Sequence, residues 1–220
     1  MEKQYVEQAR FNMVEQQVRP AEVLDPTVLD LIGKSHRENF VPAPYMKLAY
    51  SDTAIPLNQS EVMMTPIVEA RMLQALAITP TDKILEIGSG CGYVTSLLAA
   101  LGQSVISLEL DPTLAKSAED NLRKAGIDNV EIICKDGSHG YAERGLYEVI
   151  AVTASLPQTS AAIEQQLSIG GRAFMVIGKA PTMEATLVTR ISETEVLREP
   201  LFETVLPAMR NIPQHPEFVF

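Results

Sequence analysis

The feature that most constrains the fold is a glycine-rich turn, Glu86-Ile87-Gly88-Ser89-Gly90-Cys91-Gly92, between a short apolar run and a helical segment. The run 84–87 has the length and character of a buried parallel strand, and residues 93–101 have those of a helix. Glycines let the backbone turn sharply and let a ligand approach it closely, and a helix N-terminus adds unpaired N–H groups. The turn therefore predicts a strand–helix unit that can hold a ligand.

Strands and helices alternate after this turn. Strand-like runs follow at residues 104–110, 130–134, 147–153 and, after a Gly170-Gly171 turn, 172–177, and helical segments follow at 112–126 and 157–167. This alternation with short links predicts an α/β fold with a doubly wound, mostly parallel sheet. Apolar–polar alternation over 185–191 and 196–204 predicts a C-terminal antiparallel strand pair. The tail, 207–220, reads as an extended strap.

The first 80 residues are helical and contain no strand–helix repeat. One helix ends at Arg19-Pro20, a second begins at Asp25-Pro26 and closes at Gly33, and a third opens at Thr65-Pro66. The stretch 39–56, rich in proline and tyrosine, predicts an irregular but ordered loop.

The charge balance and the cysteine count exclude several classes of protein. Asp and Glu number 28 against 18 Lys and Arg, a formal net charge of −10, so we expect no nucleic-acid partner. No apolar run approaches the length of about 18 residues that spans a membrane, and the N-terminus lacks an apolar secretory core. We therefore expect no membrane partner. Cys91 and Cys134 supply neither a disulfide framework nor a metal set, which predicts a cytoplasmic protein without a bound metal.

Two acidic residues end the next two strands at the edge where the glycine turn lies. Glu109 ends the strand 104–110, about 20 residues after Gly88, and Asp136-Gly137 follows the strand 130–134. Ligands of open α/β sheets bind beyond the carboxyl ends of the strands, where a carboxylate can accept hydrogen bonds from ribose hydroxyls. These features predict a nucleoside-type cofactor site. An exposed strand-end charge for Glu109 and a turn role for Asp136 stay open as alternatives.

Tyr93 stands where the dinucleotide fingerprint G-x-G-x-x-G needs its third glycine, and the P-loop pattern is absent. The glycine turn and the two strand-end acids resemble class I S-adenosylmethionine-dependent methyltransferases, which have a Rossmann-like sheet. The resemblance implies that the turn lies against the amino-acid part of S-adenosylmethionine, that Glu109 holds the ribose and that Asp136 addresses the adenine. The implied cofactor-binding residues are Glu86, Gly88, Ser89, Gly90, Cys91, Glu109, Leu110, Asp136, Gly137 and Met63.

The order of segments over residues 25–206 is similar to that of the protein-L-isoaspartate O-methyltransferase family, which methylates damaged aspartyl residues and so starts their repair. The matching stretches are Arg37-Glu38-Asn39-Phe40-Val41-Pro42, Ala70-Arg71-Met72, Thr79-Pro80, residues 85–93, Asp136-Gly137, Val152-Thr153-Ala154 and Gly170-Gly171-Arg172. A helical segment ahead of the sheet is also a feature of the family. We therefore expect a substrate-side helical segment over 1–80 and the cofactor-binding domain over 81–220, packed as a single compact unit.

The chain departs from the family in the loop before the third helix. The family carries a Gln-Thr-Ile-Ser-x-Pro loop, whose serine lies beside the transferring methyl and the substrate carboxylate. Aligned on Pro66, Met64 takes the place of the serine and Val62 that of the threonine. The predicted catalytic positions are therefore Met64, Thr65 and Ser60. The alternatives for Ser60 and Thr65, an ordinary loop residue and a helix cap, stay open. For Met63 and Met64, an apolar wall for a different acceptor and simple core packing also stay open.

A carboxylate acceptor with a pKa near ~4 is already ionised at neutral pH, so methyl transfer to it needs alignment and desolvation rather than a general base. The resemblance implies carboxyl methylation of isoaspartyl residues in a protein or peptide substrate. The alternatives are a small-molecule O- or N-methyltransferase, for which His139 is a candidate base, and a non-catalytic protein that binds S-adenosylmethionine. The family's Arg-Phe-Val-Pro-type segment, which helps grip the substrate backbone, corresponds to residues 204–210.

Overall fold

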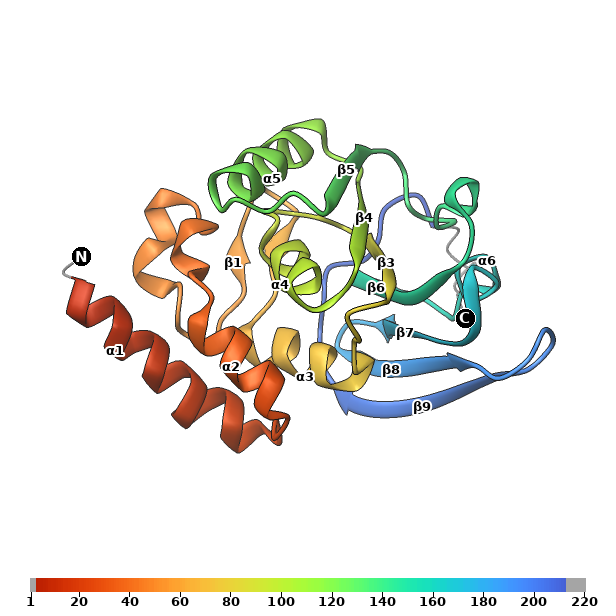
Figure 1. Ribbon diagram of the computed structural model, residues 1–220, viewed down its shortest axis with the longest axis horizontal. Helices are drawn as coiled ribbons and strands as arrows, with labels where there is room; N and C mark the ends of the chain where they lie inside the picture. The colour runs from red at the N-terminus through yellow and green to blue at the C-terminus, as the bar shows by residue number, and fades with distance from the viewer. Residues whose placement is uncertain (1–2, 213–220) are drawn as a thin grey trace, which may run out of the picture.

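The fold is organised around a seven-stranded sheet with the order β5-β4-β3-β6-β7-β8-β9 (Figure 1). The structure, a computed structural model, describes residues 3–212. The five strands β5, β4, β3, β6 and β7 are parallel to one another, and β8 and β9 extend the sheet with antiparallel pairing. The strands are β3 (Lys83–Ile87), β4 (Ser104–Glu109), β5 (Val130–Cys134), β6 (Tyr147–Leu156), β7 (Leu167–Lys179), β8 (Thr182–Arg190) and β9 (Val196–Glu203). The predicted α/β class, mostly parallel sheet and C-terminal strand pair are confirmed.

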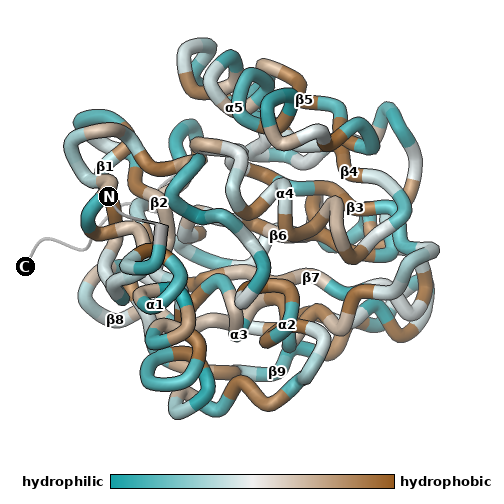
Figure 2. The backbone as a smooth tube through the Cα atoms, turned by 60° about the vertical axis from the view of Figure 1, so that its left-hand side comes forward, coloured by the Kyte–Doolittle hydropathy of each residue, from teal (hydrophilic) through white to brown (hydrophobic). Residues whose placement is uncertain are grey.

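Helices cover the sheet and form the N-terminal part of the described chain. They are α1 (Lys3–Met13), α2 (Pro26–Lys34), α3 (Pro66–Leu76), α4 (Tyr93–Leu101), α5 (Pro112–Lys124) and the short α6 (Ala161–Glu164). Asp25, Thr65 and Asp111 cap α2, α3 and α5 by accepting hydrogen bonds from backbone N–H groups, and a proline follows each cap. Helix α4 is mostly hydrophobic, whereas α5 is predominantly hydrophilic and lies on the outside (Figure 2).

Side chains that alternate along the strands build a core on each face of the sheet. On β6, Val149 and Ala151 face one core, which also contains residues of α2, α3 and α4, such as Ile32 and Met72. On the same strand, Ile150 and Val152 face the other core with Ile163 and Leu167. The first core joins the N-terminal helices to the sheet. The division of the chain at residue 80 stays a prediction.

Several predicted boundaries are wrong. In place of the helix predicted over 157–167, the structure has the short helix Ala161–Glu164. The predicted segment starts directly after β6, which ends at Leu156, and its last residue, Leu167, is already the first residue of β7. The first helix does not end at Arg19-Pro20 but passes through a π-helical turn, Val14–Val18, into a 3₁₀ turn, Arg19–Ala21. Helix α2 ends at Lys34, one residue after Gly33.

Three further segments gain structure from long-range pairing. The Gly170-Gly171 pair lies inside β7, where the pairing with β6 shifts register, rather than in a turn before it. The loop 39–56 contains a 3₁₀ helix, Ala43–Leu48, and ends in β1 (Ile55–Pro56), which pairs with β2 (Val62–Met63). In the tail, the backbone at 207–209 pairs with Ser155 at the end of β6, as an extended strap would, while residues 213–220 lie outside the described part. Within residues 3–212, no helix has the length and apolar character needed to cross a membrane.

Candidate active site

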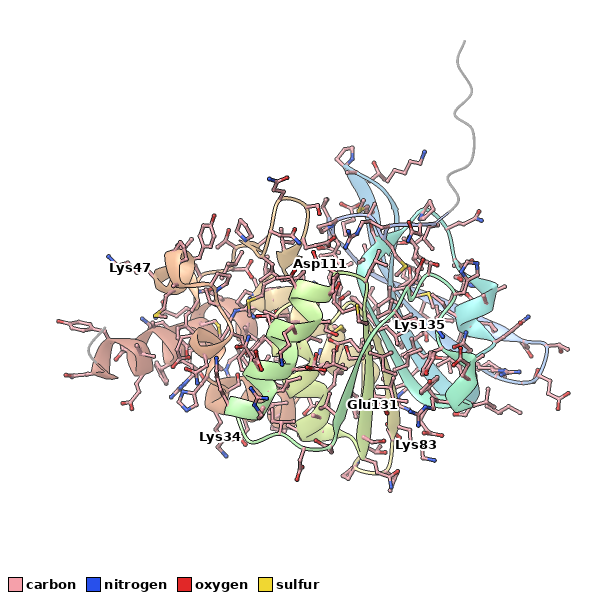
Figure 3. The ribbon with its side chains drawn as sticks, turned by 90° about the horizontal axis from the view of Figure 1, so that it is seen from above. Lys34, Lys47, Lys83, Asp111, Glu131 and Lys135 are labelled. Atoms are coloured by element: carbon pink, nitrogen blue, oxygen red, sulfur yellow. The ribbon has the colours of Figure 1, made fainter. Side chains whose placement is uncertain are left out.

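A cavity lies beyond the carboxyl ends of β3, β4, β5 and β6, where the sequence predicts the cofactor. In Figure 3, Lys83 marks the opposite end of the sheet, and Asp111 and Lys135 mark the end with the cavity. Six of the predicted cofactor residues line it: Gly88, Gly90, Glu109, Leu110, Asp136 and Gly137. The structure therefore brings together the glycine turn and both strand-end acids.

The glycine turn is shaped by its contact with the end of β6. Gly88 has φ +101°, and a Cβ there would lie 2.3 Å from the Thr153 Oγ1 atom. The Thr153 hydroxyl lies 2.7 Å from the Gly88 carbonyl oxygen and can donate to it. Only a glycine accommodates both this φ and this close neighbour. Thr153 therefore fixes the turn against β6, and it also lines the cavity.

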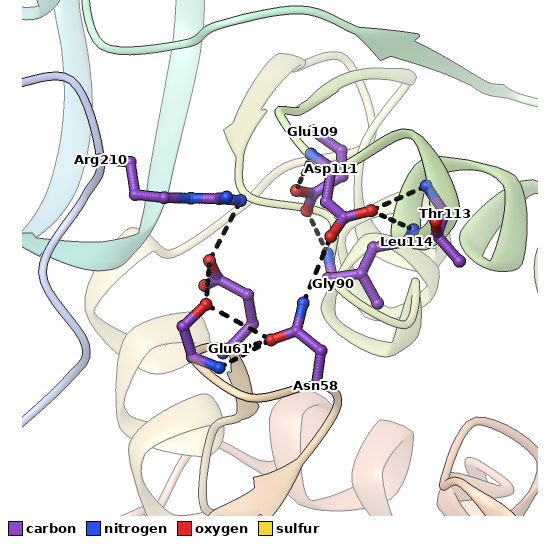
Figure 4. A network of polar contacts seen from close by, with 9 residues as sticks. Asn58, Glu61, Gly90, Glu109, Asp111, Thr113, Leu114 and Arg210 are labelled. Carbon is purple, nitrogen blue, oxygen red and sulfur yellow. Dashed lines mark hydrogen bonds and ion pairs between the residues drawn. The ribbon is translucent and has the colours of Figure 1, made fainter.

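Glu109 holds the glycine turn from the side of β4. Its two carboxylate oxygens accept hydrogen bonds from the backbone N–H groups of Gly90 and Asp111, both at 2.9 Å (Figure 4). The side chain is buried and lines the cavity, so an exposed strand-end charge is excluded. A carboxylate oxygen can accept more than one hydrogen bond, which leaves Glu109 able to bind hydroxyls in the cavity.

Asp136 occupies the corresponding place after β5. One carboxylate oxygen accepts from the Ser138 N–H (2.9 Å) and the other from the Asn211 side-chain amide (2.8 Å). Although partial burial works against it, these hydrogen bonds hold the pKa of Asp136 below its usual range. Asp136 thus takes the turn role and faces the cavity as well.

Three residues of the glycine motif are buried and do not line the cavity: Glu86, Ser89 and Cys91. The Glu86 carboxylate accepts hydrogen bonds from the hydroxyls of Thr95 and Ser107, each at 2.5 Å, and Ser107 lies 2.6 Å from the Ser89 hydroxyl. Burial raises the pKa of Glu86 to about 7. The hydrogen bonds of Glu86 and Ser89 support the glycine turn from within the protein. The cavity lining does not include these residues, so their predicted contact with a cofactor stays a prediction.

The β1–β2 hairpin (residues 55–63) and Met64 carry the predicted catalytic positions, and the structure separates them. Met63 and Met64 are each 3% exposed and belong to the core that α3 and α4 share, which favours the core-packing interpretation. Thr65 caps α3, its hydroxyl accepting from the Val68 N–H, and Ser60 lies exposed at the hairpin tip. None of the predicted catalytic positions lines the cavity; Leu57, Glu61 and Val62 are the hairpin residues that do.

The hairpin tip and the C-terminal strap (residues 204–212) meet over the cavity. Arg210 of the strap forms an ion pair of 3.1 Å with Glu61, and the Asn58 amide donates to Asp111 at 3.3 Å (Figure 4). Leu57, Glu61, Met209 and Arg210 line the cavity beneath these contacts. The residues that close the cavity therefore come from two segments more than a hundred positions apart.

A second, mostly apolar groove continues from the cavity between the hairpin and the strap. Val62, Ala208 and Met209 line both spaces. Ser155, Met183 and Leu206 are among the other residues of this strap groove. An acceptor in the groove would reach the cavity past Val62. His139 does not line either space, and its ring lies 2.9 Å from the Ser138 hydroxyl.

The residues at the cavity suit S-adenosylmethionine. Carboxylates at the ends of β4 and β5 accept hydrogen bonds from ribose and adenine donors, and the Gly88 and Gly90 positions leave room for close approach to the backbone. In the part of the chain that is described, no three His, Cys, Asp or Glu side chains are grouped to bind a metal ion. A glycine turn with two strand-end acids on this sheet defines a Rossmann-like methyltransferase.

The comparisons with known proteins narrow this class. The family model of the protein-L-isoaspartate(D-aspartate) O-methyltransferases (PCMT) matches residues 8–208, and the chain belongs to this family. A protein-L-isoaspartate O-methyltransferase of Methanospirillum hungatei is 39% identical over 181 residues, 82% of this chain and 84% of the relative. One of Gloeobacter violaceus is 34% identical over 203 residues, 92% of this chain and 99% of the relative.

A solved structure shows the same fold. The crystal structure of a PCMT protein from Plasmodium falciparum in complex with S-adenosyl-L-homocysteine has a TM-score of 0.80 to this chain. The two are 20% identical, and the match covers 92% of this chain and 99% of that one.

Sequence reasoning missed several residues of the site. Thr153 could have been found, because it is the last residue of the strand predicted over 147–153 and lies at the same sheet edge as Gly88. Arg210 ends the segment 204–210 that corresponds to the family's substrate-gripping segment, but no sequence signal indicates its pairing with Glu61 or the place of Leu57 in the cavity, since only the folded chain brings the strap and the hairpin together.

Proposed function

We propose that this protein transfers the methyl group of S-adenosylmethionine to the carboxylate of isoaspartyl residues in proteins and peptides. The observation that carries the proposal is the cavity at the sheet edge, where the glycine turn, Glu109 and Asp136 converge in a chain of the PCMT family. The relatives at 34–39% identity carry the name of this activity.

The chain's own residues bind, orient and exclude water. Glu109 would hold the ribose and Asp136 the adenine, with the glycine turn against the amino-acid part. When bound, S-adenosylmethionine would supply the methyl group of its sulfonium: the acceptor carboxylate would bond to the methyl carbon as the carbon–sulfur bond breaks in line, and S-adenosylhomocysteine would leave. Because the acceptor is ionised at neutral pH, no side chain has to remove a proton. The hairpin tip and the strap supply alignment and desolvation instead.

We place the acceptor in the strap groove, with its carboxylate at the junction lined by Val62, Ala208 and Met209. These three side chains are apolar and offer the acceptor no hydroxyl, so donors to its carboxylate would come from backbone N–H groups or from polar side chains of the adjoining cavity, such as Thr153 and Arg210. The strap backbone, which pairs with Ser155, lies along one wall of this groove. An extended peptide fits a groove of this construction better than a compact metabolite does. A cytoplasmic location and the absence of nucleic-acid and membrane partners stay predictions.

The test uses purified protein with methyl-labelled S-adenosylmethionine and two peptides of identical sequence, one with an isoaspartyl and one with an aspartyl residue. We expect label to enter the isoaspartyl peptide alone and to leave as methanol in base, as a methyl ester does. Glu109→Ala serves as the loss-of-binding control. Labelling of neither peptide, together with tight binding of S-adenosylhomocysteine, would overturn the proposal and favour a non-catalytic binding protein. Turnover only with small metabolites would favour the other alternative.

A further inference from the structure

A buried arginine connects the cofactor side of the site with the hairpin that covers it. Arg37 is 0% exposed and Glu69 of α3 is 1% exposed, and the two form an ion pair. Arg37 begins the stretch Arg37-Glu38-Asn39-Phe40-Val41-Pro42, one of the segments that match the family, yet it lines neither the cavity nor the strap groove. Its position in the fold shows what it can do.

The guanidinium of Arg37 contacts three separate elements at once. One terminal nitrogen donates to the Glu69 carboxylate on α3, and the other donates to the Met64 carbonyl oxygen at 2.6 Å. The Arg37 Cζ atom lies over the ring of Tyr93, 4.8 Å from its centre, and Tyr93 is the first residue of α4 and directly follows the glycine turn. A planar fork of donors can make these contacts together, whereas the compact ammonium of a lysine cannot.

The neighbours of Arg37 hold Tyr93 from the same side. The Ser35 and Tyr93 hydroxyls are hydrogen-bonded at 2.7 Å, and the Phe40 ring packs edge-on against the Tyr93 ring with 5.5 Å between centres. The segment 35–40 therefore contacts the start of α4 through three side chains. Through Arg37, it also reaches the Met64 carbonyl group, in the backbone that connects the hairpin to α3.

Stability by itself accounts poorly for this pair. Arg37 Nε and Glu69 Oε1 are buried and find no hydrogen-bond partner among the described residues. Removing two charges from water is costly, and well-packed apolar side chains often replace a buried ion pair without loss of stability. What apolar side chains cannot do is donate a hydrogen bond to the buried Met64 carbonyl group.

Backbone pairing within the hairpin is short, and the rest of its base is held by the burial of Ile55 and Met63 in the core. Its two strands pair over only two positions, Ile55 with Met63 and Pro56 with Val62, and Pro56 has no N–H to donate. Val62 precedes Met64 by two residues and lines both the cavity and the strap groove. A shift of the Met64 carbonyl therefore moves Val62 and, beyond it, Glu61 at the tip.

We propose that Arg37 is a positioning residue for methyl transfer, which fixes the hairpin over the cavity by tying the Met64 carbonyl to α3 and to the start of α4. This role rests on the proposed function, because it concerns how the acceptor is aligned. The glycine turn keeps its own supports, Thr153 and Glu109, so the loss of Arg37 acts mainly on the acceptor and little on the cofactor.

The test separates positioning from stability with a paired replacement. In Arg37→Met with Glu69→Leu, both charges are removed, the buried volume is largely kept and the bond to the Met64 carbonyl is lost. We expect kcat/KM for the isoaspartyl peptide to fall roughly ten- to a hundredfold, since misplacement by about 1 Å can cost that much. The dissociation constant of S-adenosylhomocysteine should change by less than about threefold. In Arg37→Lys, which keeps the charge without the fork, a smaller loss in kcat/KM is expected.

Arg172 offers a matched control at the far end of α3. It too donates to backbone carbonyl groups, those of Leu76 and Ala77, and pairs with the buried Asp82. Arg172→Met should lower stability but leave the kcat/KM of the folded protein unchanged. A paired Arg37/Glu69 variant that folds and retains wild-type kcat/KM would overturn the proposal.

Hydrogen exchange of the hairpin gives a readout that does not need activity. Amides of residues 57–64 should exchange faster in the paired variant than in the wild type or in Arg172→Met, because their anchor is lost. Equal exchange in all three proteins would overturn the proposal even if activity fell. Failure of the wild type to methylate the isoaspartyl peptide would instead count against the proposed function, and the exchange comparison would still decide the role of Arg37.

Discussion

Glu86 is a buried carboxylate with no cation beside it among residues 3–212, and its titration should be visible in the stability of the protein. Its Oε2 accepts from Thr95 and Ser107, whereas Oε1 is buried and has no hydrogen-bond partner within residues 3–212. Burial raises the pKa to about 7, and the charge of Glu109 adds to the rise. In the unfolded chain the pKa returns to about 4.3.

The sign of the pH dependence follows from these two values. Below about pH 4 the group is protonated in both states, so it does not penalise folding. Between that pH and about 7 the unfolded chain loses its proton first, so the folded state binds more protons and the free energy of unfolding falls as pH rises. At about 1.4 kcal/mol for each tenfold change in proton affinity, the loss by pH 8 is about 4 kcal/mol.

The experiment compares the wild type with Glu86→Gln. A glutamine resembles the protonated carboxyl: its oxygen can still accept from Thr95 and Ser107, and it does not titrate between pH 5 and 8. In urea unfolding at pH 5, 6, 7 and 8, the stability of the variant relative to the wild type should rise by about 2–3 kcal/mol over the series, since part of the loss has already occurred by pH 5.

The difference between the two proteins cancels the titration of every group that they share, including Glu69, whose pKa burial raises to about 8. Glu119→Gln, at an exposed carboxylate of α5, controls for the removal of one surface charge and should show a constant difference. Parallel stability curves for the wild type and Glu86→Gln from pH 5 to 8 would refute the reasoning.

Three other changes test the site. Glu109→Ala should weaken S-adenosylhomocysteine binding about tenfold or more in calorimetry, since a hydrogen bond to a charged group contributes about 1.5–3 kcal/mol, and an unchanged affinity would contradict its role. Gly88→Ala should lower the free energy of unfolding by about 1–3 kcal/mol and weaken cofactor binding, because its Cβ would strike Thr153 at a positive φ. Gly126→Ala, also at positive φ but with nothing within 4 Å of a Cβ, is the matched control and should affect stability alone. Met64→Ser should cost about 2–4 kcal/mol of stability, measured by urea unfolding, because Met64 is a core residue. An increase in kcat for Met64→Ser would show instead that position 64 acts at the reacting groups.

The central strands and their helices could be predicted closely from the sequence. The segments 93–101 and 130–134 match α4 and β5 residue for residue. Buried parallel strands read as short apolar runs, and aspartate–proline or threonine–proline pairs mark helix starts through hydrogen bonds that are local to each end. The helix predicted over 157–167 is cut short at its C-terminal end because Leu167 already belongs to β7 and pairs with Tyr147 of β6, twenty positions earlier in the chain.

The sequence by itself determined the class of site, because the order of strands places a glycine turn and the two acids at one sheet edge whatever the surrounding details. It could not tell which of the predicted residues face the cavity. Glu86 and Cys91 lie in the glycine motif and yet face away from the cavity, since alternate residues of a strand and its turn point to different sides. Only the tertiary structure decided that Met64 packs in the core, that Val62 reaches the cavity, and that Arg37 donates a hydrogen bond to the Met64 carbonyl group. Those assignments depend on contacts between segments far apart in the chain, such as Arg37 with Met64 and Glu61 with Arg210, and no local sequence pattern predicts them.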